Sequence, residues 1–530
     1  MEIGKKIQNG LVRVISYGFG LFFLLLLPFL CGWHQNNFLR THLTPWKVAL
    51  FAALFLLLLW GAAVWGPRLR KRLSKRAVTG VTLLVLLCLQ FVFATAAYTE
   101  IGFDCGQLIQ LAQEGEKALT DGYLLQFPNN VTLTLLWQIW WKLTQAFFSD
   151  IWFACIVLNI LFVDAAIYFC YRIADRFYSE RVFWITWVLA VLELGLTPYL
   201  LVPYSDTMAM PFVAGSVYAA MAYQQSFGAA KCLPAAAALG FCLLFGSRVK
   251  PTVAIVGIAL LLSAGLWMLG KPYQRAAVKE FVHRKKTLKI RLLALSLVCF
   301  LAGGIPGLLV DVCRYSAVPR EEWEEKAYSW KHFLMMGLSH EVISSDITVY
   351  GCYYAPDYAF AASFATRDER EQASLEVFKQ RVSELGADGV LKAYGYKLLW
   401  SFSDGAFFYG REGNFHAGCP RSAEGLRGLL QNATYIETDF YNNWLCNLQQ
   451  GLWLAMCILL STSLFQKPRN ILFGWETVLY VAVLGLCSYL MLFECRARYV
   501  LLFLPVFVIL SAICGGRILE RKLKNERQCP

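Results

Sequence analysis

The sequence predicts an all-α protein that crosses a membrane many times, and three observations lead to this prediction. Of the 530 residues, 58% are hydrophobic and only 16% are charged, which is more apolar surface than one soluble core can bury. Apolar runs recur along the chain, and many reach the roughly 18 to 20 residues that a helix needs to cross a bilayer. Short basic segments separate these runs, as expected of cytoplasmic loops. We therefore expect about 12–13 transmembrane helices.

The net charge and the cysteines exclude several other classes of protein. The formal charge of +13 does not indicate nucleic-acid binding, because the basic residues lie in short loops between spans and not on one folded face. The 17 cysteines fall mostly within apolar runs and form no CxxC pair, so they indicate packing. Five cysteines lie outside the runs, and a disulfide among them stays an alternative: Cys105, Cys352, Cys419, Cys446 and Cys495.

Thirteen apolar runs give the predicted order of spans. They lie near residues 14–32, 46–66, 79–97, 131–148, 151–171, 182–199, 206–224, 232–246, 250–270, 292–312, 448–466, 472–492 and 498–514. Both termini and the basic segments 68–76, 172–181 and 271–291 are predicted to be cytoplasmic. Two cytoplasmic termini require an even number of crossings. One run therefore does not cross, either 131–148, which contains Gln138, Lys142 and Gln145, or 232–250, which is short.

This order divides the chain into three parts. Residues 1–312 form an N-terminal transmembrane module with an outer loop at 98–130, residues 313–447 form an extracytoplasmic soluble segment, and residues 448–530 form the last helices and a basic tail. The soluble segment contains half of the 36 acidic residues of the protein. Apolar stripes near 371–386 and 389–402 predict two helices of a small helical domain, with a break at Gly386 and Gly389.

The outer loop 98–130 carries the first candidate site residues. Glu100 and Asp104 follow the span 79–97, and an amphipathic helix is predicted to follow them along the membrane surface. The stretch Phe127-Pro128-Asn129-Asn130 predicts the end of one helix and the start of another. A carboxylate at the edge of the hydrocarbon is costly unless it is used or paired, so Asp104 is predicted to be a general base. The alternative is a solvated acid near a helix end.

Two more polar groups are predicted at the same membrane face. A sugar linked to a lipid phosphate leaves an anionic group at headgroup depth, which needs cations, and its acceptor hydroxyl needs a base. The predicted phosphate-binding cations are Arg248, Lys250, Arg496 and Arg498. The predicted substrate-binding residues are Tyr204, Asp206, Glu494 and Tyr499. A displacement from the opposite face of the sugar would invert the anomeric centre and would need only one catalytic carboxylate.

Structural roles stay open for several of these residues. Arg248 and Lys250 could be cations that snorkel from a helix end, and Asp206 could be the N-cap of the span 206–224. Glu494 and Arg498 have the i,i+4 spacing of a helical ion pair. Asp164, within the span 151–171, could pair with an arginine inside the bundle.

These marks resemble the GT-C superfamily of integral membrane glycosyltransferases, on the branch of protein O-mannosyltransferases and lipid A aminoarabinose transferases. The resemblance covers residues 79–514. It rests on Asp104 and the juxtamembrane helix 105–120, on Tyr123–Asn130, on Pro203–Asp206 and Arg248–Thr252, and on Glu494–Tyr499 before the last span. The chain departs from the family in its ExxxD spacing of Glu100 and Asp104 and in the two extra spans before residue 79. Glu100 is therefore the alternative base.

The resemblance implies a transferase in a bacterial plasma membrane, with its active site on the extracytoplasmic face. The donor would be a polyprenyl-phosphate-linked sugar and the acceptor an extracytoplasmic glycolipid, polymer or protein. No cofactor is certain; some members of the superfamily bind a divalent metal, and the lone acid here favours none. Membrane lipids are expected partners and nucleic acid is not. One rival hypothesis is a flippase for lipid-linked sugars without transferase activity, and another is a non-catalytic protein whose acidic outer segment binds a partner.

Overall fold

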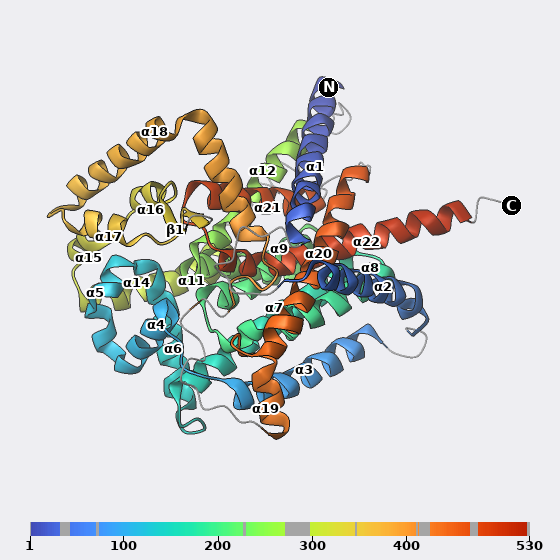
Figure 1. The fold of residues 1–530 in the computed structure, drawn as a ribbon, viewed down its shortest axis with the longest axis horizontal. Coiled ribbons are helices and arrows are strands. Elements are labelled where there is room, and N and C mark those ends of the chain that lie inside the picture. Colours follow the sequence, from blue (N-terminus) through green and yellow to red (C-terminus); the bar gives the residue numbers. More distant parts are fainter. Residues whose placement is uncertain are drawn as a thin grey trace.

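The computed structural model describes residues 2–31, 43–69, 74–225, 229–270, 297–344, 347–409, 412, 424–466 and 475–526. The described chain is almost entirely helical (Figure 1). The predicted basic loop 271–291 and Cys419 lie outside these residues. The helices up to residue 270 are α1 (Glu2–Leu30), α2 (Pro45–Leu69), α3 (Lys75–Ala97), α4 (Phe103–Glu114), α5 (Gly122–Gln126), α6 (Val131–Thr144), α7 (Ile151–Phe177), α8 (Glu180–Leu189), α9 (Ser205–Gln225), α10 (Ala229–Gly240), α11 (Gly246–Val249) and α12 (Ala254–Gly270).

The second half of the chain alternates between bundle helices and an outer segment. Its elements are α14 (Ile305–Ala317), α15 (Arg320–Lys326), α16 (Trp330–Met336), β1 (His340–Ser344), β2 (Ile347–Tyr350), α17 (Ala355–Ala362), α18 (Arg367–Phe402), α19 (Gly425–Asn432), α20 (Cys446–Ser461), α21 (Trp475–Leu492), the 3-10 helix η11 (Ala497–Phe503) and α22 (Leu504–Glu526). The helix of the span before the outer segment continues to Ala317, so the outer segment begins just after that residue.

The polytopic α-helical class is confirmed. Within the described residues, nine helices are long and apolar enough to cross a membrane, and the other four predicted runs are also helical, as α6, α8, α9 and α12. With only 14 residues, α6 is about 21 Å long, which is short of the roughly 30 Å of hydrocarbon. The stretch Cys232–Val249, in contrast, has 18 residues and the apolarity of a span. The structure therefore favours 131–148 as the run that does not cross.

One end of the bundle brings together the segments predicted to be cytoplasmic. The Lys75 ammonium lies 3.0 Å from an Asp175 carboxylate oxygen and 3.2 Å from one of Glu180, which joins the loops 68–76 and 172–181. Arg517, near the C-terminus, forms an ion pair with Glu476 at the start of α21. These contacts place the basic segments 68–76 and 172–181 and the start of the basic tail at the ends of neighbouring spans.

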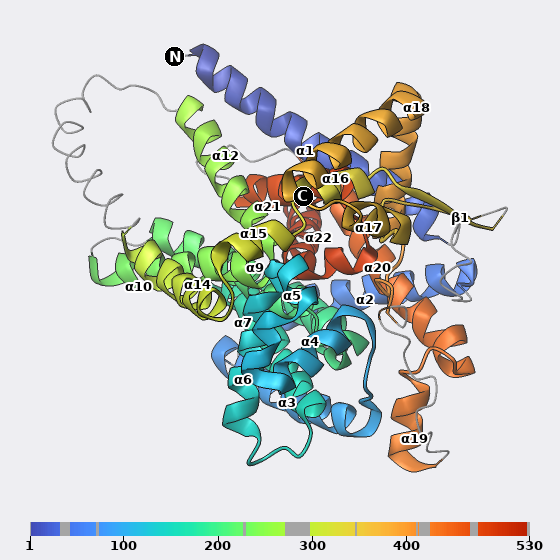
Figure 2. The same ribbon diagram turned by 90° about the vertical axis from the view of Figure 1, so that its left-hand side faces the viewer.

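The opposite end carries the outer elements. In Figure 1, α4, α5 and α15–α18 gather on the left, far from the C-terminal end of α22, and Figure 2 looks directly onto them. The Tyr328 backbone N–H donates a 3.0 Å hydrogen bond to the Gln126 carbonyl, which joins the outer segment to the outer loop. The juxtamembrane helix predicted at 105–120 is present as α4 followed by a 3-10 turn at Gly115–Thr120.

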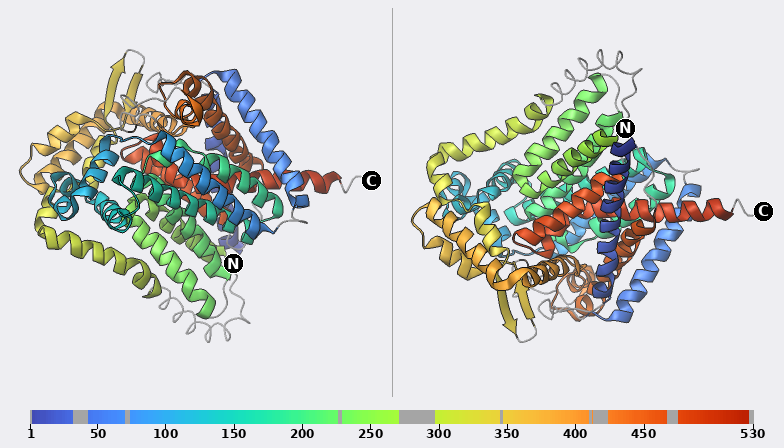
Figure 3. Two further views of the ribbon diagram at one scale, coloured as in Figure 1. Left: turned by 90° about the horizontal axis from the view of Figure 1, so that it is seen from below. Right: turned by 90° about the horizontal axis from the view of Figure 1, so that it is seen from above.

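Helix α22 runs through the middle of the bundle (Figure 3). Every residue from Leu501 to Gly516 is buried, so neighbouring helices surround this apolar helix on all sides. The 3-10 helix η11 continues directly into α22. Side chains at the start of η11 are therefore fixed at the outer end of the most buried helix.

The outer segment is mostly helical, as predicted, with one exception. Strands β1 and β2 form an antiparallel hairpin that was not predicted, because strands of five and four residues are too short to show a clear alternation. The break predicted between two helical stripes is confirmed as a kink of α18 at Gly386, whose φ of 62° favours glycine. A capping box between Thr366 and Glu369 begins this long helix.

Candidate functional site

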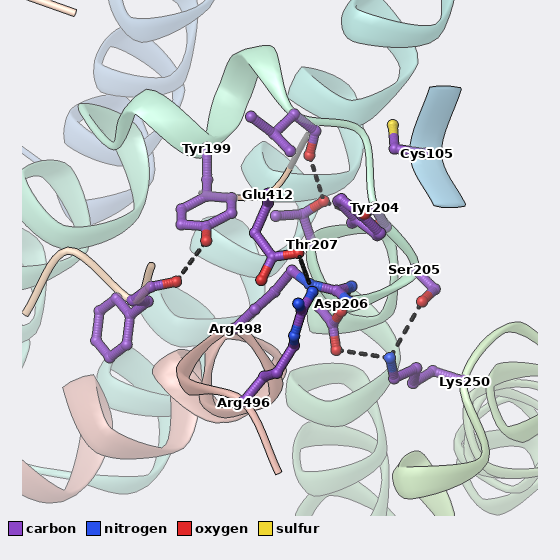
Figure 4. Close-up of polar contacts among 12 residues, drawn as sticks. Cys105, Tyr199, Tyr204, Ser205, Asp206, Thr207, Lys250, Glu412, Arg496 and Arg498 are labelled. Atoms are coloured by element: carbon purple, nitrogen blue, oxygen red, sulfur yellow. Dashed lines mark hydrogen bonds and ion pairs between the residues drawn. The ribbon is translucent and has the colours of Figure 1, made fainter. Parts of the chain in front are cut away.

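Five charged side chains meet at the outer end of the bundle, and we call them the charge cluster (Figure 4). Its members are Asp206, Lys250, Glu412, Arg496 and Arg498. They come from α9, from the residue after α11, from the outer segment and from the loop before α22. Segments far apart in the sequence thus supply one group of opposite charges.

Arg498 is the centre of the charge cluster. Its Nη1 lies 2.5 Å from Asp206 Oδ2 and its Nε lies 3.1 Å from Glu412 Oε2. The guanidinium also stacks 3.7 Å from the centre of the Tyr204 ring, a favourable cation–π contact. The side chain is only 3% exposed. Arg498 therefore fixes two carboxylates from different segments, and no large part of it reaches solvent.

Lys250 and Arg496 are the cations at the margin of the cluster. The Lys250 Nζ lies 2.9 Å from Asp206 Oδ1 and donates to Ser205 Oγ at 3.2 Å, and the Arg496 Nη1 donates to Glu412 Oε2 at 2.9 Å. Their side chains are 15% and 24% exposed. Lys250 is extended, with φ −146° and ψ 115°, because the following proline disfavours helix there. These two cations are the ones that a ligand could reach.

Asp206 does not cap its helix, so the alternative of an N-cap is wrong. Helix α9 begins one residue earlier, at Ser205, and Asp206 lies inside its first turn. Its carboxylate is fully buried between Arg498 and Lys250. The positive end of the helix dipole adds to the stabilisation that these two cations give the carboxylate.

Glu412 is the site residue that the sequence analysis missed. It follows a buried turn in which the Asp404 carboxylate accepts hydrogen bonds from the backbone N–H groups of Ala406 and Phe408 at 2.9 and 2.8 Å. The Tyr199 hydroxyl donates to the Phe407 carbonyl and so anchors this turn to the bundle. Nothing in the sequence distinguishes Glu412 from the many other acids of the outer segment.

Glu494 is half-buried beside the cluster, and the alternative of a helical ion pair with Arg498 is wrong. Residues 494–498 do not form a regular α-helix, since Arg496 is extended with φ −150°, so the i,i+4 spacing does not bring the two side chains together. The Tyr499 hydroxyl donates a hydrogen bond to Glu494 instead. Burial raises the pKa of Glu494, and the Arg496 guanidinium counteracts part of this rise.

Asp104 lies in the first turn of α4 with an exposed side chain, and its charge acts on Tyr204, the ring that stacks on Arg498. The Tyr123 hydroxyl donates to Asp104 and accepts from the Asn130 amide at 3.1 Å. Burial and the Asp104 charge together raise the pKa of Tyr123. The charge of Asp104 also acts on Glu494. The acid therefore shares its surroundings with the cluster.

Two local features hold Asp104 in this position. The neighbouring Cys105 thiol donates to the Pro203 carbonyl at 3.3 Å, which fastens the start of α4 to the segment before α9. Phe103 adopts a left-handed φ of 51°, a conformation that a bulky residue rarely takes. The chain thus turns sharply immediately before the acid.

Other predicted residues lie apart from this group. Arg248 forms a bidentate pair with Asp311, at 2.8 and 2.7 Å, and is 43% exposed, so it does not join Lys250 in the charge cluster. Glu100 is exposed and acts on Tyr98. Asp164 accepts a 3.1 Å hydrogen bond from Gln90. Its partner is therefore an amide and not the arginine considered as one alternative.

The cluster suits an anionic group better than a metal ion. Three cations and two carboxylates leave one net positive charge, and the exposed parts belong to Lys250 and Arg496. Among the described side chains, no three of His, Cys, Asp or Glu gather as a metal site would require.

Fold and site define a multi-pass helical membrane protein with a buried charge cluster at one end of its bundle. The chain belongs to the family described as conserved hypothetical integral membrane protein, which it matches over residues 10–517. It matches no curated protein and no solved structure. The family description gives the membrane class of the protein and assigns it no activity.

Proposed function

We propose that this protein is a membrane glycosyltransferase that uses a polyprenyl-phosphate-linked sugar. The observation that carries the proposal is the meeting of Lys250, Arg496 and Arg498 around two carboxylates, beside Asp104, at the end of the bundle opposite the basic loops. A lipid phosphate at headgroup depth needs cations there, and an attacking hydroxyl needs a nearby base.

The cations have two different roles in this proposal. Lys250 and Arg496 contact the phosphate oxygens, because their side chains reach the margin of the cluster. Arg498 is a positioning residue, because Asp206 and Glu412 already engage its buried guanidinium. Arg248 has no role in donor binding, since its fork is engaged by Asp311.

Asp104 is the general base in the proposed reaction. The acceptor hydroxyl loses its proton to the Asp104 carboxylate while its oxygen forms a bond to the anomeric carbon. The bond from that carbon to the phosphate oxygen breaks, and polyprenyl phosphate leaves with the electron pair. Attack opposite to the leaving group inverts the anomeric centre. Lys250 and Arg496 stabilise the negative charge that develops on the phosphate.

The hydrogen bonds of Asp104 support its assignment over Glu100. The Asn130 amide holds the Tyr123 oxygen and the Tyr123 hydroxyl holds the carboxylate, so the acid is oriented while its outer side stays open to solvent. Glu100 is exposed four residues before Asp104. Its charge adds to the effects of burial and of Asp150, which raise the pKa of Tyr98. An oriented acid beside fixed cations is the better base.

The test is transfer by the purified protein in liposomes. Polyprenyl-phosphate hexoses with a radiolabelled sugar are supplied one at a time together with an extract of envelope glycolipids and polymers, and consumption of donor is followed. We expect Asp104→Asn to lower transfer by roughly 10²- to 10⁴-fold, the size typical of the loss of a general base. Donor binding should be unchanged.

Two matched variants complete the experiment. Glu116→Gln removes an exposed acid of the same outer loop and should leave transfer unchanged. Glu100→Gln tests the other candidate base. Full transfer by Asp104→Asn would reject the role of Asp104. Donor that moves between leaflets but is never consumed would support a flippase instead.

A further inference from the structure

Two cysteines of the outer end lie against one another. Cys352 follows the hairpin, and Cys495 stands between Glu494 and Arg496 in the loop before η11. The Cys495 backbone N–H donates to the Gly351 carbonyl at 2.7 Å, and its thiol lies 3.3 Å from the Tyr350 carbonyl. The Cys352 thiol lies 3.2 Å from the Cys495 carbonyl. A further hydrogen bond joins the two thiols directly.

A buried lysine completes this site. The Lys397 Nζ donates to the carbonyls of Gly337, Met491 and Phe493 at 2.6, 2.7 and 2.7 Å. Gly351 has a φ of +62°, and a side chain there would come within 2.6 Å of the Lys397 Cε. The segment before Cys352 can therefore approach the lysine only because position 351 is a glycine.

The surroundings make the two thiols unequal. Burial raises the pKa of Cys352. Burial also opposes ionisation of Cys495, but the hydrogen bond from Cys352 and the charge of Lys397 outweigh it and lower the pKa of Cys495. The Cys495 thiolate is the better nucleophile of the pair, because the thiolate and not the thiol attacks a disulfide.

We propose that Cys352 and Cys495 form a disulfide that fastens the outer segment to the loop carrying Glu494 and Arg496. The two residues lie at the end of the bundle opposite the basic loops, which is the face where disulfides form and persist. Most of the other described cysteines of the bundle lie within helices, as Cys155 and Cys170 do in α7. Cys352 and Cys495 differ from these because both lie in loops of the outer end and contact one another.

Formation of this bond needs an oxidant, which we take to be the disulfide of a thiol oxidoreductase. Cys352, which is half-buried, loses its proton and attacks one sulfur of that disulfide to form a mixed disulfide, and the other sulfur leaves as a thiolate. The Cys495 thiolate, which is fully buried, then attacks Cys352 Sγ and displaces the sulfur of the oxidoreductase. The chain thereby loses two protons and two electrons, and the oxidoreductase is reduced to its dithiol.

The bond would act on the charge cluster through one residue. Arg496 follows Cys495 directly and holds Glu412. A disulfide that closes a loop of 143 positions restricts the unfolded chain strongly, and it also restricts the site loop in the folded protein. This inference stands apart from the transferase proposal, because the bond is detected by mass and not by activity.

The first test identifies the bond directly. Membranes from cells that express the full chain are treated with N-ethylmaleimide before lysis, and the purified protein is digested without reductant and analysed by mass spectrometry. We expect one cross-linked peptide pair that contains Cys352 and Cys495. Recovery of both residues as N-ethylmaleimide adducts would overturn the proposal.

The second test separates a disulfide from two packed thiols. Cys352→Ser and Cys495→Ser should each lower the thermal unfolding midpoint by about 5 °C, the double variant should lose no more than either single one, and wild-type protein in reductant should match them. Cys170→Ser serves as control and should respond equally with and without reductant. A wild-type midpoint unchanged by reductant, with additive single losses, would contradict the bond.

Discussion

Two arginines that were predicted to bind the same phosphate, Arg248 and Arg498, have different surroundings. Arg498 is 3% exposed and binds two carboxylates, whereas Arg248 is 43% exposed and binds one. Both arginines form short ion pairs, yet the free energy of each ion pair depends on how far water reaches it. An exposed pair is weakened by water and salt, while a buried charge that loses its partner stays unpaired at high cost. Short distance alone therefore does not identify the functional cation.

The largest effect is expected from removing the centre of the charge cluster. Among the described residues, Arg498→Met leaves Glu412 with Arg496 as its one remaining cation and Asp206 with Lys250 as its one remaining cation, and removing one partner of a buried pair costs about 3–5 kcal/mol. We expect a large loss in the thermal unfolding midpoint in detergent, or loss of folded protein. Arg498→Lys should lose less, because the charge remains although one ammonium cannot reach both acids. An unchanged midpoint in Arg498→Met would contradict the comparison.

A buried ionisable group without a counter-ion sharpens the comparison further. His332 in α16 is buried against Tyr328 and Tyr358, with ring centres 4.4 and 4.8 Å away, and burial lowers the pKa of His332 to about 4, against an opposing effect of Asp357. The unfolded chain binds the proton near pH 6.5, so stability should fall by about 3 kcal/mol as the pH falls from roughly 6.5 to 4.

The matched variant for this pH dependence is His332→Phe. It keeps an aromatic ring among the tyrosines and removes the titrating nitrogen atoms. The midpoint of the variant should fall less than that of the wild type between pH 7 and pH 4, when both are measured by thermal unfolding. Parallel curves for the two proteins would show that His332 does not cause the loss.

A smaller effect on stability is expected from the margin of the cluster. Lys250→Met removes the contacts to Asp206 and Ser205, but Arg498 still holds Asp206, so we expect a loss of about 2 kcal/mol. Because Lys250 is proposed to contact the donor phosphate and to stabilise the charge that develops on it, the KM for donor should rise and kcat should fall. An unchanged KM and kcat would show that Lys250 does not contact the phosphate.

The smallest effect is expected at the exposed pair. Arg248→Met should lower the free energy of unfolding by about 1 kcal/mol or less, and this loss should shrink as salt is added. Transfer should stay close to that of the wild type. A loss of transfer as large as that of Lys250→Met would show that Arg248 leaves Asp311 to bind substrate.

Much of the fold follows from the sequence, because the properties that decide it are local. Apolar length predicts the helices of the bundle, and Gly386 marks the kink of α18 because only glycine adopts its φ without strain. The β hairpin was missed because its strands have only five and four residues, too few to show a period that distinguishes a strand from a loop.

The site was only partly predictable, because the residues of the charge cluster come from segments that are distant in sequence and meet only in the folded protein. Lys250 precedes a proline, and Arg498 lies at the start of an apolar run. These neighbours led to the prediction that both residues lie at the membrane edge. The same reasoning selected Arg248. Its side chain, which lies in the short helix α11, binds Asp311 and not the residues of the charge cluster. Glu412 lies more than 80 residues from Arg498 in sequence, and no local pattern reports a contact across that distance.

Lys397 has one more consequence for the study of this molecule. Its amine is enclosed by three carbonyl oxygens, and a reagent that modifies amines cannot reach it while the outer segment is seated on α21. The rate at which such a label arrives at this position therefore measures how often the segment lifts from the bundle. Amine labelling of Lys397 therefore reports the opening of the outer segment without any added probe site.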